Sequence, residues 1–167
     1  MSGRNWMMRR MLIDAIRNDP EWQGGNYEKQ PSAVKTAQVF FGIATAGGAL
    51  ALYRAAPTRA QADAELDRRL AQPFQTDAND LLYQYEASRD YNPEPNLRKI
   101  TARLLAINSA DDERNPPELG VMEQAMKRLR NGRYVLLPIT SESRGHGTGG
   151  NASLWRQYLA EALQSPK

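Results

Sequence analysis

The sequence contains no cysteine and a single histidine among its 167 residues. Without cysteine the chain cannot form a disulfide, a thiolate nucleophile or a cysteine-based zinc or iron–sulfur site. A metal site would have to be built from carboxylates and one imidazole ring, and no spaced acidic loop supplies further oxygen ligands. We therefore expect no bound metal.

A large charge excess and a long hydrophobic run are also missing. The formal net charge is only +3, and the basic residues occur in short groups beside helical patterns, which are typical of solvated faces, so we expect no nucleic-acid partner. The longest uncharged run, residues 37–53, is rich in glycine, alanine and threonine and falls short of the about 20 strongly apolar residues of a bilayer span. We expect a buried helix there and no membrane partner. No signal-peptide pattern opens the sequence. A targeting signal would lie in the missing front, so the compartment stays open, with the cytoplasm as the default expectation.

Residues 1–100 carry helical patterns and no strand pattern. Apolar positions at helical spacing, proline stops and a capping box of Thr58 with Gln61 define the expected segments. The expected helices cover residues 5–18, the chain from Ser32 with a break or close contact at Gly47–Gly48, the segment after Thr58, and residues 77–88. The first hundred residues are therefore predicted to be a helical region.

Residues 101–167 have a different character, with two short apolar runs at 102–107 and 134–139 that are typical of buried parallel strands. A helix is predicted between them, and Asn151 can cap a last helix. The apolar face predicted for the intervening helix consists of Leu119, Met122, Met126 and Leu129. Strand–helix–strand–helix implies a right-handed parallel crossover. Two strands alone leave sheet edges exposed, so part of the sheet is expected to be missing.

Polar residues follow each predicted strand, where functional groups gather in parallel sheets. Asp111, Asp112 and Glu113 follow the first strand, and His146 lies between two glycines after the second. A carboxylate followed by a histidine is the order of the last two members of a Ser...Asp...His triad. Two plainer interpretations stay open: the acids are solvated turn residues ahead of a helix, or His146 is a polar loop residue.

Four segments together resemble the C-terminal half of the α/β-hydrolase superfamily, and especially its homoserine O-acetyltransferase branch with the hydrolase relatives of that branch. They are LLAINSADDERNPPELG, YVLLPITSESRGHGT, NDPEWQGGNY and TDANDLLYQYEASRDYNPEP. The resemblance implies an α/β fold in which a helical lid, residues 1–100, precedes the C-terminal part of the sheet domain, residues 101–167.

The resemblance also assigns two site residues. Asp112 matches the triad acid because the family's proline pair follows four and five residues later, as Pro116 and Pro117 do here. His146 matches the triad histidine, whereas Asp111 falls one position early. The resemblance implies that Asp112 binds one ring nitrogen of His146 while the other nitrogen takes the proton of a serine. No bound cofactor is implied, and acetyl-CoA would be a co-substrate if the enzyme is an acyltransferase.

Several departures from the family separate this chain from a complete enzyme. It contains no G-x-S-x-G nucleophile elbow, and Ser141 and Ser143 follow the last strand. The oxyanion-hole loop is also missing. Gln38 replaces an arginine found in the transferases, and Gly147 replaces an acid that follows their histidine. Both changes remove charges that suit a zwitterionic homoserine.

We therefore predict the C-terminal portion of a serine ester hydrolase or acyltransferase, about half of a domain, that is inactive without a complementing N-terminal segment. Its substrate would be a small-molecule ester or thioester. Two alternatives stay open: a homoserine O-acetyltransferase proper, or a non-catalytic interaction module in which His146 is structural.

Overall fold

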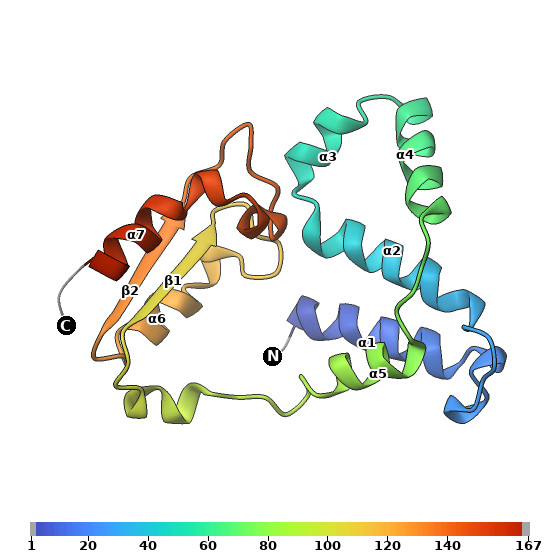
Figure 1. The fold of residues 1–167 in the computed structure, drawn as a ribbon, viewed down its shortest axis with the longest axis horizontal. Helices are drawn as coiled ribbons and strands as arrows, with labels where there is room; N and C mark the ends of the chain where they lie inside the picture. Colours follow the sequence, from blue (N-terminus) through green and yellow to red (C-terminus); the bar gives the residue numbers. More distant parts are fainter. Residues whose placement is uncertain (1–2, 165–167) are drawn as a thin grey trace. The chain divides into compact units, whose positions relative to one another are not determined.

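The computed structural model describes residues 3–164, and their contacts divide the chain into two units (Figure 1). We call them the helical unit, which comprises the chain up to Ala44 together with Ala56–Asn92, and the sheet unit, which comprises Thr45–Ala55 together with the chain from Pro93 onward. No single helix among the described residues is long and apolar enough to cross a bilayer.

The helical unit is built from helices whose apolar residues recur every three or four positions. Its elements are α1 (Gly3–Arg17), η1 (Pro20–Gly25), α2 (Ser32–Ala46) as far as Ala44, α4 (Arg59–Ala71) and α5 (Ala78–Glu86). The buried core consists of Leu12, Ile13 and Ile16 from α1, Val34 and Phe41 from α2, and Ala78, Leu81 and Leu82 from α5. This spacing places one face of α1, α2 and α5 in a common core. All four predicted helices are present.

Burial in these helices does not follow hydropathy alone. In α1, Met7 and Met11 are exposed, whereas Ile13 is buried. The expectation that the run 37–53 is a buried helix was wrong, because Phe40 and Tyr53 are exposed. The predicted break at Gly47–Gly48 is present between α2 and α3 (Ala49–Ala55), where Gly48 has a left-handed φ of 67°. Hydropathy alone does not distinguish a buried helix from one whose apolar side is left open.

The helix starts are fixed by side-chain caps. The predicted capping box is complete, because Thr58 accepts from the Gln61 amide and the Gln61 side chain accepts from the Thr58 amide. At α5, the Asp77 carboxylate accepts from the amides of Asn79 and Asp80 and from the hydroxyl of Tyr27 at 2.6 Å. Tyr27 thereby connects a distant loop to the start of α5.

The sheet unit contains two parallel strands, β1 (Leu104–Ser109) and β2 (Gly132–Leu137), whose register runs from Leu104 opposite Gly132 to Ser109 opposite Leu137. Its helical elements are α3, η2 (Glu94–Lys99), η3 (Pro117–Leu119), α6 (Val121–Met126), η4 (Gly147–Gly150), η5 (Ala152–Leu154) and α7 (Arg156–Gln164). α6 and α7 lie alongside the strands (Figure 1). The two strands end side by side, which places the loops that follow them at one edge.

The strand–helix–strand–helix order is present, but several boundaries differ from the prediction. β1 starts two residues later than expected and β2 both starts and ends two residues earlier. The polar Asn108 and Ser109 belong to β1 because a ladder is formed by backbone groups and tolerates polar side chains. The intervening helix is short because Gly120, at a φ of 62°, separates η3 from α6, and Leu119 is exposed. Asn151 caps η5, not α7.

Candidate active site

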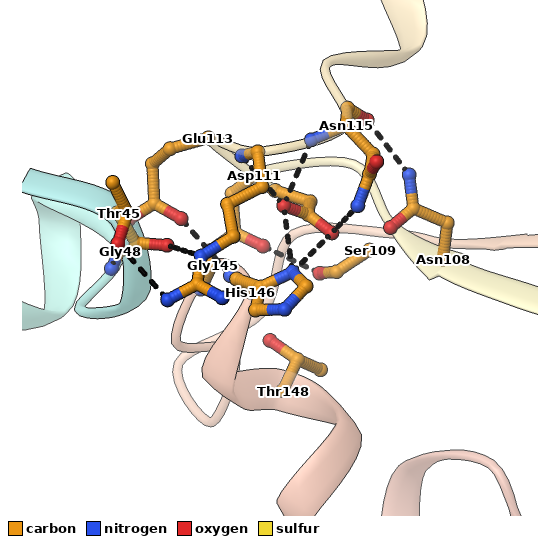
Figure 2. Close-up of polar contacts among 12 residues, drawn as sticks. Thr45, Gly48, Asn108, Ser109, Asp111, Glu113, Asn115, Gly145, His146 and Thr148 are labelled. Atoms are coloured by element: carbon orange, nitrogen blue, oxygen red, sulfur yellow. Dashed lines mark hydrogen bonds and ion pairs between the residues drawn. The ribbon is translucent and has the colours of Figure 1, made fainter. Parts of the chain in front are cut away.

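The loops after β1 and β2 meet at the carboxyl ends of the two strands. The acidic run Asp111, Asp112 and Glu113 follows β1, and Gly145 with His146 follows β2. Figure 2 shows the side chains of Asp111 and Glu113 beside the segment that carries Gly145 and His146. Each of the three carboxylates accepts a hydrogen bond from this segment. The parallel register therefore produces the proximity that the chain order predicted.

Asp112 is buried and held in place from its own loop. Its Oδ1 accepts from the amide of Arg114 at 2.8 Å and from the amide of Asn115 at 3.1 Å, and its Oδ2 accepts from Asn115 Nδ2 at 3.1 Å. Asn108 in turn donates to the Asn115 carbonyl at 2.8 Å (Figure 2). These bonds fix the orientation of the carboxylate independently of its contact with His146.

The ionised form of Asp112 is favoured despite its burial. Burial raises the pKa of the Asp112 carboxyl, but hydrogen bonds from the Asn115 side chain, the His146 ring and two backbone amides together lower that pKa below its usual range. The carboxylate can therefore act only as an acceptor.

His146 places its ring against this carboxylate. Its Nδ1 lies 3.1 Å from Oδ2 and 3.2 Å from Oδ1 of Asp112. Because an ionised carboxylate donates nothing, Nδ1 must carry the hydrogen, which leaves the lone pair on Nε2 when the ring is neutral. The carboxylate side chain is 5% exposed and the histidine side chain 38%, so an oriented ring faces a partly open surface. This arrangement can accept a proton at Nε2.

Gly145 provides the backbone turn that His146 needs. Its φ is 56°, in the left-handed region, and a Cβ on this residue would lie 2.2 Å from Glu113 Oε2. The positive φ favours glycine, and a side chain here would displace the Glu113 carboxylate. Two flanking glycines would also allow His146 itself an unusual backbone, but that expectation is wrong, because His146 has ordinary helical angles. Of the two glycines, Gly145 has a positive φ and Gly147 does not.

Asp111, which falls one position early in the family pattern, does not contact the ring in this way. Its Oδ2 accepts from the Gly145 amide at 3.0 Å, and its Oδ1 accepts from the Ser109 hydroxyl. Sequence reasoning did not find the role of Arg114, which donates to the carbonyl and hydroxyl of Thr45 at 2.9 and 3.0 Å. Nothing in the spacing could have indicated a partner so distant in the chain.

Comparison with known proteins gives a consistent structural answer. No family model and no curated protein matches the sequence. Among solved structures, esterase E22 superposes with a TM-score of 0.76 at 20% identity, over 96% of this chain and 50% of that one. The acetyl esterase MekB superposes with a TM-score of 0.66 at 21% identity, over 98% of this chain and 52% of that one. An acetylester hydrolase from Corynebacterium glutamicum superposes with a TM-score of 0.67 at 12% identity, over 98% of this chain and 51% of that one.

The chain has the fold of the C-terminal part of an α/β-hydrolase. It spans about half the length of these solved structures. The predicted fold class is thus confirmed, while the homoserine O-acetyltransferase branch receives no support from these esterases.

Two buried serines near this site, Ser109 and Ser143, are hydrogen-bonded to nearby residues of the chain. Ser143 is buried, and its hydroxyl donates to the Thr140 carbonyl at 2.9 Å while accepting from the Thr140 amide at 3.0 Å. Ser109 donates to Asp111. These hydroxyls fix turns, as serine commonly does in loops. Asp112 and His146 thus contact each other on a chain whose sequence contains no G-x-S-x-G motif.

Proposed function

We propose that this chain supplies the acid and the general base of a serine ester hydrolase, Asp112 and His146. The observation that supports the proposal is the fixed contact between His146 Nδ1 and the buried, ionised carboxylate of Asp112. Serine and oxyanion donors would come from a complementing N-terminal segment with a G-x-S-x-G elbow. The substrate is proposed to be a small-molecule ester or thioester.

The proposed reaction uses His146 twice. As the serine oxygen attacks the carbonyl carbon, its proton passes to Nε2, and Asp112 stabilises the imidazolium that forms. When the tetrahedral intermediate collapses, Nε2 gives this proton to the departing alcohol or thiol. Water then attacks the acyl-enzyme, Nε2 takes a proton from that water, and the proton returns to the serine oxygen as the acid is released.

Complementation tests this proposal. The chain would be joined to an N-terminal segment carrying a strand, a G-x-S-x-G elbow and a helix, and hydrolysis of p-nitrophenyl acetate would be measured. We expect turnover from the completed protein and none from the chain alone. His146→Ala should lower kcat by about 10²–10⁴-fold. Glu118→Gln, at an exposed position on η3, is the control that should leave activity unchanged.

Each remaining outcome points to a different function. Turnover that survives His146→Ala would contradict the assignment of the base. Acetyl-CoA-dependent acetylation of homoserine by the completed protein would favour the transferase, for which acetyl-CoA is the acyl donor. A completed protein that folds but turns over neither substrate would favour a non-catalytic interaction module.

A further inference from the structure

Glu113 is bonded to two backbone amides that lie far apart in the sequence. Its Oε2 accepts from the amide of His146 at 2.9 Å, and its Oε1 accepts from the amide of Gly48, in the turn between α2 and α3 (Figure 2). Because one rigid carboxylate serves both amides, the position of either segment constrains the other. The bond to His146 lies on the backbone of the residue whose ring contacts Asp112.

Two left-handed glycines make this contact close. Gly48 has a φ of 67°, and a Cβ there would lie 2.6 Å from the Gly145 nitrogen. A Cβ on Gly145 would in turn strike the Glu113 carboxylate. The turn, the glutamate and the histidine loop therefore touch with no room for a side chain between them, and a displacement of one must be taken up by the others.

Two further bonds from the same loop hold the end of α2, directly before the turn. Arg114, the next residue along the chain, donates to both the carbonyl and the hydroxyl of Thr45. Its own amide donates to Asp112. The segment after β1 thus holds the α2–α3 turn through two successive side chains while it orients the ring of His146 through a third.

We propose that Glu113 is a positioning residue that couples the α2–α3 turn to His146. The inference rests on the proposed function, because it gives Glu113 a role in aligning the base for catalysis. Movement of the turn would be transmitted through the carboxylate to the His146 amide, and so to the angle at which Nε2 faces the substrate. Asp112 would set the ring's tautomer, and Glu113 would set the position of its backbone.

Amide hydrogen exchange tests the coupling on the 167-residue chain. Glu113→Ala should speed exchange at both Gly48 and His146 by at least about tenfold, because each amide loses a charge-assisted bond. Glu113→Gln offers only one acceptor oxygen, so one of the two amides should keep its protection and the other lose it. Glu118→Ala is the control for loss of an acidic side chain, and it should leave the exchange rates of the Gly48 and His146 amides unchanged.

The ring of His146 reports whether the Glu113 variants remain folded. It is the sole histidine, so its ¹⁵N signals are identified without assignment, and an Nδ1-bound hydrogen shows that the contact to Asp112 survives. With that contact present, unchanged exchange at both amides in Glu113→Ala, or a change at only one, would overturn the coupling.

Kinetics of the completed protein separate this inference from the proposed function. Glu113→Ala should lower kcat about tenfold and change KM less than twofold, because the base is misaligned while the substrate site is kept. An equal fall in activity from a rise in KM alone would overturn the positioning role. If the unsubstituted completed protein has no esterase activity, the proposed function fails, whereas the exchange results still decide whether Glu113 links the two segments.

Discussion

At Asp112, exchanging one oxygen for an amide should change which nitrogen of His146 carries the proton. In Asp112→Asn, the backbone amides of Arg114 and Asn115 would retain the remaining oxygen as their acceptor. The new NH₂ group would then face Nδ1 as a donor, so the neutral ring would carry its hydrogen on Nε2, the nitrogen that must accept a proton in the proposed reaction. The ¹⁵N shifts of the imidazole measure this directly, and an unchanged Nδ1–H tautomer would contradict the prediction.

The depressed pKa of Asp112 also predicts a pH-dependent stability. Its folded pKa lies below the unfolded value of about 3.9, so its contribution is complete above that value and is lost as pH falls through the folded pKa. Asp112→Ala should therefore lower the free energy of unfolding of the sheet unit by about 2 kcal/mol at pH 7 and by less below about pH 4. Urea titrations followed at Trp155 measure this, with the exposed Asp67→Ala as control. A difference that does not shrink at low pH would show that packing, not charge, is lost.

Sequence reasoning reached Asp112 and His146 but not the residues that hold them. The pair was identifiable because its chain order and the proline pair resemble a family pattern. The Gly48–Glu113 bond joins positions that no local pattern connects, and Glu113 had the plain alternative of a solvated turn acid. Long-range contacts of this kind follow from how segments pack, which residue spacing does not encode.

At the scale of single elements, the start of α5 should depend on Asp77 more than on an ordinary cap. The bond from the Tyr27 hydroxyl is the main cause that lowers the pKa of this carboxyl, with backbone amides adding to the effect. We expect Asp77→Ala to lower the free energy of unfolding of the helical unit by about 2 kcal/mol at pH 7, more than the about 1 kcal/mol typical of a cap.

Tyr27→Phe provides the matched comparison for Asp77. It removes the hydroxyl while leaving the α5 amides capped. It should therefore lower the free energy of unfolding by less than Asp77→Ala does. Denaturant unfolding followed at Trp22, which packs against the helical core, measures both variants. An equal loss of unfolding free energy in the two variants would show that the tyrosine bond, and not the cap, accounts for the stabilisation by Asp77.

Helices were predicted better than strands because capping and proline stops are local. Thr58 with Gln61 and Asp77 mark starts that the structure reproduces. The strand ends were displaced by two residues because pairing of β1 with β2 depends on the partner strand, not on the apolar run itself. Gly120 shortened a helix that apolar spacing alone extended too far.

At the scale of the whole molecule, the two units differ in how much apolar surface they bury. Among the described residues, the helical unit contains the cluster centred on Ile13, Ile16 and Leu81, whereas Leu137 is the one buried apolar side chain of the sheet unit. β1 and β2 pair only with each other within the described part of the chain, and Leu136 and Ile139 are exposed. A parallel sheet is normally covered on both faces. We therefore expect the sheet unit to be less stable than the helical unit.

This difference predicts the order in which the units unfold. The sheet unit should lose structure at a lower urea concentration than the helical unit, since burial of apolar area is the main source of stability.

The tryptophans distinguish the unfolding of the two units: Trp155 lies in the sheet unit, and Trp6 and Trp22 lie in the helical unit. Trp155→Phe should leave only the later fluorescence transition, and Trp6→Phe with Trp22→Phe only the earlier one. Coincident midpoints for the two variants would mean that the units unfold as one cooperative body. If the proposed N-terminal segment complements the sheet, its addition should raise the Trp155 midpoint, because it would cover the exposed strands.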